Sequence, residues 1–300
     1  MQSASVSDST ISTAPPVLVR RFERCPCCCS KELYTIWHNC APETIKDWKS
    51  FMFGGRRFFD RVMECKACGF RYLEPITLGE KYYRMADHSE YHLLSSARLR
   101  YFSKIKKALH NRGYNFASNT QILDIGAGAG DWLSIWPEVK RRYATELLSE
   151  FIHHMKTQGI TLLSNLGTTN EQFNMITAFD FLEHVENPNY LLQTISNRLN
   201  DKGIAVFGVP NMGKFLARLL GTKYYLYCPM HYSYFTQNSL NKLLSKYFKK
   251  VEIFASPPMY CTLNTVMKWV CPKLQFPVLN NMWLPFGYSA SLIAIAKNAS

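Results

Sequence analysis

The spacing of apolar residues predicts that strands and helices alternate from residue 120 onward. Strand-length apolar runs and stretches of amphipathic helical spacing follow one another along this part of the chain. We expect one strand within 120–125, a second that ends at Glu146, and two more at 173–179 and 204–209. Helices are expected within 147–159 and 188–199. Because such alternation forms a mostly parallel sheet with helices on both faces, the pattern predicts a doubly wound α/β fold.

A further helix is predicted ahead of this region. Apolar residues recur at 94, 97, 101, 102, 105, 108 and 109, which is the spacing of one helical face. We expect this helix to lie on the sheet.

Four cysteines ahead of the predicted α/β region indicate an additional metal-binding module. Cys25 and Cys28 form a C-x2-C pair, and Cys65 and Cys68 repeat that spacing after 36 intervening residues. Two such turns can supply the tetrahedral sulfur cage that Zn2+ prefers, so we predict one structural zinc ion. Disulfides and a redox-active pair are the alternatives, and Cys40 or His38 could replace one ligand.

Composition and charge set the class of protein and the kind of partner. The 300 residues are 47% hydrophobic and 19% charged, which is a globular composition with room for two domains. No long apolar run or secretory signal is apparent, so a cytoplasmic protein without a membrane span is expected. The net charge of +13 favours an anionic partner.

The candidate chemistry starts at a glycine-rich turn directly after the first predicted strand of the sheet. The stretch "LDIGAGAG" places glycines at 126, 128 and 130, where the backbone can approach a ligand closely. Asp131 stands where a dinucleotide-binding fingerprint would need its last glycine, so NAD is disfavoured. Glu146 lies 20 residues after Gly126, at the end of the next strand, where a carboxylate can accept the hydroxyl protons of a ribose.

At these residues the chain resembles the class I S-adenosylmethionine-dependent methyltransferases. "ILDIGAGAG" is similar to their first motif, and "FDFLEHVENP" followed by "LNDKGIAVFGVPN" is similar to their fourth and fifth strands. The resemblance implies a Rossmann-like sheet of seven strands, with the runs at 260–270 and 290–297 as its reversed final pair. It also implies that S-adenosylmethionine is held by these residues: Asp124, Gly126, Ala127, Gly128, Glu146, Phe179 and Asp180.

The paired cysteines, "YLEP" and "KYYRM" further resemble zinc-ribbon methyltransferases that modify sugars and natural products. This resemblance implies saccharide biosynthesis and a division of the chain into a flexible tail (1–20), a zinc module (21–78), a helical linker or lid (79–117) and a methyltransferase domain (118–300) with an aromatic insertion (212–235). The expected reaction is methyl transfer to a hydroxyl or carbon of a sugar, which could be nucleotide-linked.

Methyl transfer also requires a base for the acceptor proton. His231 is the first candidate, because an imidazole accepts a proton near neutral pH, and His184 is the second. Tyr82, Tyr83 and Tyr232 are candidate substrate contacts. The aromatic segment 221–235 is either a lid over the reacting groups or a tightly packed insertion.

Two other classes of function remain open at this point. In one, the zinc module binds RNA or DNA and the enzyme methylates nucleic acid, although the Asn-Pro-Pro-Tyr motif of amino-methylating enzymes is absent after the fourth strand. In the other, the chain is a non-catalytic scaffold of the same fold. The presence of Asp124, the glycine turn and Glu146 argues against this alternative.

Overall fold

The computed structural model of the protein describes residues 22–38, 61–74, 94–167, 169–221, 224, 226–227, 231–263, 282–286 and 291–298. Its largest element is a sheet of seven strands in the order β10-β13-β8-β7-β4-β5-β6. The five strands from β8 to β6 are parallel, and β13 is antiparallel to both β8 and β10. The bounds are β4 Gln121–Ile125, β5 Arg141–Thr145, β6 Thr161–Leu162, β7 Phe173–Phe179, β8 Leu199–Pro210, β10 Lys250–Ala255 and β13 Ser291–Lys297. The doubly wound, mostly parallel sheet of seven strands is confirmed.

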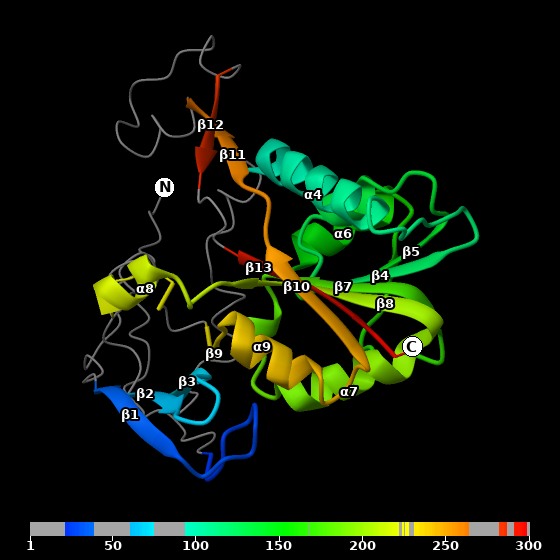
Figure 1. Cartoon of the computed structure of the whole chain (residues 1–300). Helices are drawn as coiled ribbons and strands as arrows, with labels where there is room; N and C mark the ends of the chain where they lie inside the picture. Colours follow the sequence, from blue (N-terminus) through cyan, green and yellow to red (C-terminus); the bar gives the residue numbers. More distant parts are fainter. Residues whose placement is uncertain are drawn as a thin grey trace, which may run out of the picture.

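Helices cover both faces of this sheet (Figure 1). On one face lie α4 (Ser95–His110), the short α5 (Asp131–Ser134) and α6 (Ser149–Thr157), and on the other lie α7 (Pro188–Arg198) and α9 (Gln237–Leu244). The predicted helix ahead of the sheet is therefore present as α4.

Along each central strand, successive side chains pack alternately against the helices on the two faces of the sheet. In β4, Ile122 packs in the cluster that contains Ile105 of α4, whereas Leu123 packs in the cluster that contains Leu192 of α7. Side chains of a strand alternate between faces, so a strand that is covered on both sides is apolar at consecutive positions. The uninterrupted apolar runs in the sequence have this cause.

The reversed strand pair at the edge of the sheet differs from the prediction. Its two members are β10 and β13, and only β13 falls in a run expected to form the pair. The run at 260–270 instead contributes β11 (Met259–Thr262), which pairs with β12 (Trp283–Phe286) in a separate two-stranded sheet beside α4. Because β10 is an edge strand with exposed Lys250 and Glu252, its apolar signal is weaker than that of the run beyond it.

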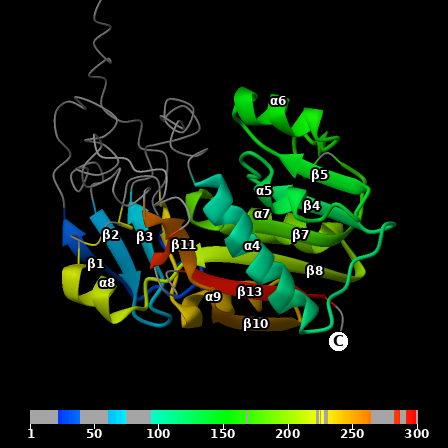
Figure 2. The ribbon, with the colours of Figure 1, turned by 90° about the horizontal axis from the view of Figure 1, so that it is seen from above.

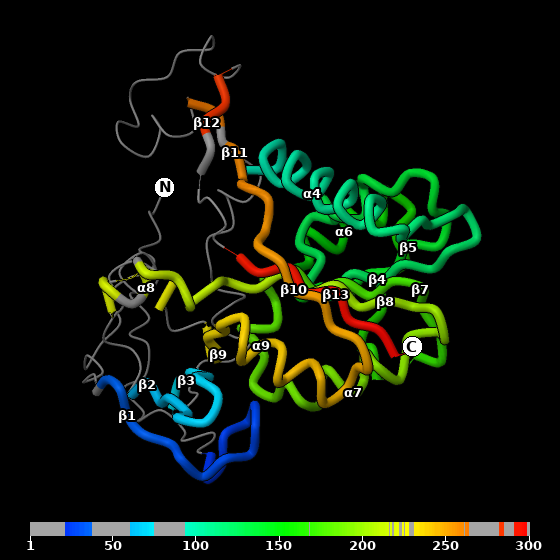
Figure 3. The backbone as a smooth tube through the Cα atoms, in the orientation of Figure 1, coloured from blue at the N-terminus to red at the C-terminus, as the bar shows by residue number. Residues whose placement is uncertain are grey.

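A second, four-stranded sheet joins the start of the chain to a distant segment. Three strands, β1 (Leu33–His38), β2 (Arg61–Cys65) and β3 (Arg71–Glu74), form an antiparallel series, and β9 (Ser233–Tyr234) adds to β3. Figure 2 shows this sheet on the side to which the carboxyl ends of β4 and β7 point. The backbone trace in Figure 3 brings β9 back beside β3 before the chain enters α9. The N-terminal module, which contains β1, β2 and β3, therefore lies at the carboxyl-end edge of the seven-stranded sheet, where the glycine turn also lies.

Candidate functional site

The glycine turn after β4 adopts a conformation that side chains rarely allow. Gly126, Gly128 and Gly130 all have positive φ, at 68°, 54° and 81°. A Cβ at Gly126 would lie 2.3 Å from the Cδ2 atom of Phe181, so a side chain does not fit there. The amide nitrogens of Gly126 and Ala127 donate to the carbonyl oxygen of Thr145 at the end of β5, at 3.0 and 3.1 Å. The turn is thereby fixed to the neighbouring strand.

Two carboxylates flank this turn. Glu146 accepts a hydrogen bond from the Gly128 amide at 2.8 Å through Oε2, and from the Leu147 and Leu148 amides through Oε1. Asp124 is buried and accepts from the hydroxyl of Thr177 at 2.6 Å. Burial raises the pKa of Asp124 to about 7, with the Thr177 hydrogen bond opposing this shift and the charge of Glu146 adding to it. The acidic residues predicted from the sequence do converge on one turn.

The carboxyl end of β7 lies next to the same turn. Phe179 packs between Phe102 and Trp132, at ring centroid distances of 5.1 and 4.9 Å, while Asp180 has a positive φ of 48° and is solvent-exposed. The ring of Phe181 fills the space in front of Gly126. A ligand approaching the backbone of Gly126 from that side requires this ring to rotate away.

The two histidines that were candidate bases lie together, although 47 positions separate them. The imidazole rings of His184 and His231 have centroids 4.8 Å apart and an interplanar angle of 68°. The Nδ1 atom of His231 is 2.9 Å from the carbonyl oxygen of Leu226. Because a carbonyl only accepts, Nδ1 carries the proton, and Nε2 of the neutral ring keeps its lone pair.

One group next to the turn was not identified from the sequence. Asp131, the first residue of α5, accepts from the Ser95 hydroxyl at 2.9 Å and pairs with the Arg98 guanidinium at 2.6 Å. These contacts attach the start of α4 to the residue that follows the last glycine of the turn. In the sequence, Asp131 was noted only because it stands where a dinucleotide-binding motif has its last glycine. No local pattern links it to a helix more than 30 residues earlier.

The four predicted zinc ligands also come together. The ligand atoms of Cys25, Cys28, Cys65 and Cys68 all lie within 4.8 Å of one another. The sulfurs of Cys25 and Cys68 are 3.6 Å apart, and those of Cys28 and Cys65 are 3.5 Å apart. Tetrahedral zinc with bonds of about 2.3 Å separates its sulfur ligands by roughly 3.8 Å, so the four thiols fit such an ion.

The two cysteine turns are built alike. Cys29 and Gly69 both have positive φ, and each donates its amide proton to the carbonyl of the first cysteine of its pair at 2.8 Å. Cys27 is buried and its thiol donates to the carbonyl of Ser239 in α9. Cys40 and the side chain of His38, the alternative ligands, lie outside the described residues, as do Tyr82 and Tyr83.

The aromatic segment before α9 is packed into the protein as far as it is described. Tyr224, Tyr227, Tyr232 and Tyr234 are buried in one cluster with Val62 of β2 and Leu73 of β3. The backbone of Tyr232 donates to the Glu183 carbonyl at 2.7 Å and accepts from the Leu73 amide at 3.0 Å. The described part of this segment is therefore a tightly packed insertion and not a lid. Tyr232, a predicted substrate contact, has only 7% of its surface exposed.

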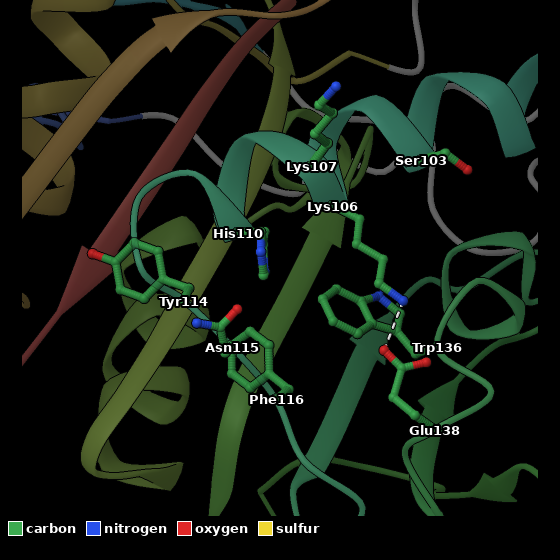
Figure 4. Close-up of a pocket in the computed structure, with 9 residues that line it drawn as sticks. All are labelled: Ser103, Lys106, Lys107, His110, Tyr114, Asn115, Phe116, Trp136 and Glu138. Carbon is green, nitrogen blue, oxygen red and sulfur yellow. Dashed lines mark hydrogen bonds and ion pairs between the residues drawn. The ribbon is translucent and has the colours of Figure 1, made fainter.

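A cavity of about 460 Å3 lies away from these groups (Figure 4). It is bordered by the last turns of α4, by residues 114–116 before β4 and by Trp136 and Glu138 before β5. Within it, the ammonium of Lys106 pairs with Glu138 at 2.7 Å and lies over the Trp136 ring. Because it is at the amino ends of the strands, this cavity is separate from the glycine turn at their carboxyl ends.

Comparisons with known proteins agree with the geometry. The family described as "Methyltransferase domain" matches residues 90–248. Two proteins named "Ubiquinone biosynthesis O-methyltransferase" are related at low identity. The one from Glaesserella parasuis serovar 5 (strain SH0165) is 23% identical over 73% of this chain and 96% of its own length. The one from Actinobacillus pleuropneumoniae serotype 5b (strain L20) is 22% identical over 69% of this chain and 88% of its own.

Among solved structures, the plantazolicin methyltransferase BpumL, in complex with a triazolic desmethylPZN analog and SAH, has a TM-score of 0.50. Its sequence is 17% identical, and the match covers 73% of this chain and 92% of that one. That likeness concerns the fold. Among the described residues, no helix has both the length and the apolar character needed to cross a bilayer. The family match covers more than half of the 300 residues, and this chain therefore belongs to the methyltransferase-domain family as an S-adenosylmethionine-dependent methyltransferase.

Proposed function

We propose that the protein transfers a methyl group from S-adenosylmethionine to a hydroxyl or carbon of a small-molecule acceptor, most simply a sugar that carries a phosphate. The observation that carries the proposal is the position of Glu146, whose carboxylate ends β5 directly beside the glycine turn. A carboxylate there accepts both hydroxyl protons of a ribose. The residues that hold the cofactor in this proposal are Asp124, Gly126, Ala127, Gly128, Glu146, Phe179 and Asp180.

The cofactor supplies a methyl group on a sulfonium, which is an excellent leaving group. The chain's own residues then have two tasks, which are to align the acceptor with that methyl group and to remove the acceptor's proton. In our proposal Nε2 of His231 takes this proton, because the hydrogen bond between Nδ1 and the Leu226 carbonyl leaves that atom as the acceptor. His184 contacts the His231 ring and supports its orientation.

The acceptor class rests on the charge of the chain and on its relatives. The net charge of +13 suits a phosphate or diphosphate on the substrate. The relatives named as O-methyltransferases support an oxygen acceptor. The sugar itself follows from the resemblance of the paired cysteines and "KYYRM" to sugar-modifying methyltransferases.

We further propose one structural zinc ion on Cys25, Cys28, Cys65 and Cys68. A closed set of four thiolates leaves no open coordination position, so the ion stabilises the turn between β2 and β3 and has no part in methyl transfer.

The test of the cofactor site is calorimetry with S-adenosylmethionine and S-adenosylhomocysteine. We expect Glu146→Gln to weaken both ligands by about tenfold or more, because both contain the same ribose and the substitution removes a charged acceptor. Glutamine keeps an oxygen for the Gly128 amide, which limits damage to the turn. The matched control is Glu150→Gln, an exposed glutamate on α6. Unchanged affinity in Glu146→Gln would remove Glu146 from the site.

The test of the base is a comparison of turnover with cofactor affinity, with a phosphorylated sugar as acceptor. His231→Ala is expected to lower kcat by about a hundredfold or more while the Kd for S-adenosylmethionine stays within about twofold. An equal loss of both quantities would mean that His231 has only a structural role.

A further inference from the structure

A carboxylate lies beside the two histidines of the candidate site. Glu183 and His184 are the last two residues of the short 3-10 helix η1 (Leu182–His184), which follows the carboxyl end of β7. The ligand atoms of Glu183, His184 and His231 all lie within 4.8 Å of one another. Within the part of the chain that the structure describes, only this cluster and the four cysteines bring three or more metal-ligating side chains so close together. One carboxylate and two imidazoles therefore converge at the edge of the sheet that carries the glycine turn.

Backbone hydrogen bonds hold the two sides of this cluster together. The Tyr232 amide donates to the Glu183 carbonyl at 2.7 Å, and the Tyr232 carbonyl accepts from the Leu73 amide of β3 at 3.0 Å. Because His231 directly precedes Tyr232 in the chain, these bonds place its ring next to η1. Glu183 is 1% exposed, so its side chain has little freedom to turn toward solvent. The three side chains are thus positioned by the fold.

The hydrogen bonding of His231 is that of a metal ligand. Histidines that bind a metal usually donate their other ring N–H to a carbonyl or a carboxylate, which fixes the ring and directs the opposite nitrogen at the ion. Nδ1 of His231 makes this contact with the Leu226 carbonyl at 2.9 Å, which leaves Nε2 as the ligand atom. Zinc with bonds of about 2.0–2.1 Å separates its ligands by roughly 3.4 Å, and side-chain movements of about 1 Å bring the three groups to that spacing.

We propose that Glu183, His184 and His231 form a second metal site, which reversibly binds a divalent ion of the zinc class. Two imidazoles favour zinc, cobalt or iron(II) over magnesium, which prefers oxygen ligands. The buried carboxylate offsets the positive charge of the ion. Three protein ligands leave a fourth position open, unlike the closed set of four thiolates. We therefore expect this site to hold its ion less tightly than the cysteine cluster and to fill only when zinc is supplied.

An ion at this site regulates methyl transfer. In the proposed function Nε2 of His231 takes the proton of the acceptor, and an ion bound to the same lone pair prevents this step. Turnover is therefore expected to fall as the site fills and to return when the ion is removed. This consequence rests on the proposed function, whereas metal binding itself does not.

The experiment is equilibrium dialysis of the full chain against Zn2+, followed by metal analysis, with the cysteine cluster already loaded. We expect the wild type to take up one additional ion per chain. Glu183→Gln and His184→Asn should each weaken this ion by about a hundredfold or more, because loss of even an outer-shell partner of a metal ligand costs roughly 10- to 100-fold in affinity. His184 is only partly buried, so its variant keeps the test valid if the Glu183 variant fails to fold.

The matched control is His153→Asn, which removes an exposed histidine of α6 outside the cluster and should leave zinc uptake unchanged. Two results would overturn the site: no additional ion in the wild type, or equal uptake by the wild type and both variants. In either case the three side chains form a hydrogen-bonded cluster without a metal. A loss of uptake as large in the control would assign the ion to surface histidines and would overturn the site as well.

Turnover with a phosphorylated sugar as acceptor tests the regulation separately. Saturating zinc should lower the kcat of the wild type by about a hundredfold, as loss of a general base does, whereas the remaining turnover of Glu183→Gln should be insensitive to zinc. An increase in turnover with zinc would overturn the inhibitory role. A wild type that takes up zinc but transfers no methyl group even in its absence would be a failure of the proposed function and not of the metal site.

Discussion

The seven-stranded sheet and the four-stranded sheet of this protein are stabilised in different ways. In the large sheet, β4 and β7 are covered by helices on both faces, and residues such as Leu123 and Ile176 are almost completely buried. The small sheet also buries apolar side chains, such as those of Val62 and Leu73, and it has ion pairs between its strands. Arg71 pairs with Glu64 and donates to the Tyr227 hydroxyl at 2.6 Å, while Arg61 pairs with Glu74 at 2.8 Å.

The difference follows from size. A small module buries too little apolar surface to offset the conformational entropy that it loses on folding, so such modules often need a metal or a partner. Here the N-terminal module has both a four-cysteine cluster and a strand, β9, from the methyltransferase domain. Further contacts join the two parts, including the Lys242 ammonium on the Ala67 carbonyl at 2.8 Å. We therefore expect metal to be needed by one sheet and not by the other.

The largest effect should come from the cysteine cluster. In small zinc domains, metal binding contributes roughly 10 kcal/mol or more to folding. Cys65→Ser should lose the expected single zinc ion and open the module to proteolysis, while the seven-stranded sheet keeps its cooperative unfolding. Zinc analysis and limited proteolysis measure both effects. The matched control is Cys29→Ser, an exposed cysteine outside the cluster. Full zinc content in Cys65→Ser would contradict the assignment.

A core substitution should show the opposite pattern. Ile176 of β7 is 1% exposed, so Ile176→Ala leaves a cavity and should cost about 2–5 kcal/mol of unfolding free energy. Urea denaturation of the large sheet measures this loss, and zinc content should be unchanged. If Ile176→Ala released zinc as readily as Cys65→Ser, the two sheets would form one cooperative unit and the comparison would fail.

A pH effect should arise at Asp124, inside the large sheet. Its pKa is about 7 in the folded protein, against about 4 in an unfolded chain. Between these values the unfolded chain has released this proton and the folded protein has not, so the free energy of unfolding falls as pH rises and levels off above about 7. The total fall is up to about 4 kcal/mol. Asp124→Asn should remove most of this dependence of the unfolding free energy on pH. Urea midpoints measured from pH 5 to pH 8 test the expectation, and the same pH dependence in wild type and variant would contradict it.

The smallest effect should distinguish the two cysteine turns. Cys29 has φ of 63° in the position where the other turn has Gly69, and non-glycine residues are disfavoured in that region by roughly 1–2 kcal/mol. Cys29→Gly should therefore stabilise the zinc-loaded module by up to about 1 kcal/mol, whereas Gly69→Ala should destabilise it by a similar amount. Thermal unfolding of the module compares the two. Destabilisation by both variants would show that the turns are not equivalent.

Much of the fold could be predicted because its signals are local. The strand β7 and the helix α7 follow from periodicity, and the glycine turn follows from a short motif whose conformation requires glycine. The identity of the edge strand β10 could not be predicted in this way, because pairing with β13 is decided by a segment about 40 positions later. Among the proposed site residues, Glu146 was predicted from its position at the end of a strand and Asp124 from the family resemblance, whereas the contact of Asp131 with Arg98 depends on how α4 packs.

By itself, the sequence determined the class of sheet, the glycine turn with its two carboxylates and the two C-x2-C pairs. These depend on spacings of a few residues, for which backbone geometry leaves few alternatives. Only the tertiary structure decided that β9 extends the N-terminal sheet, that His184 and His231 meet, and that Glu183 is buried next to them. Each of these results depends on contacts or exposure set by residues far apart in the chain, and local patterns contain no information about them.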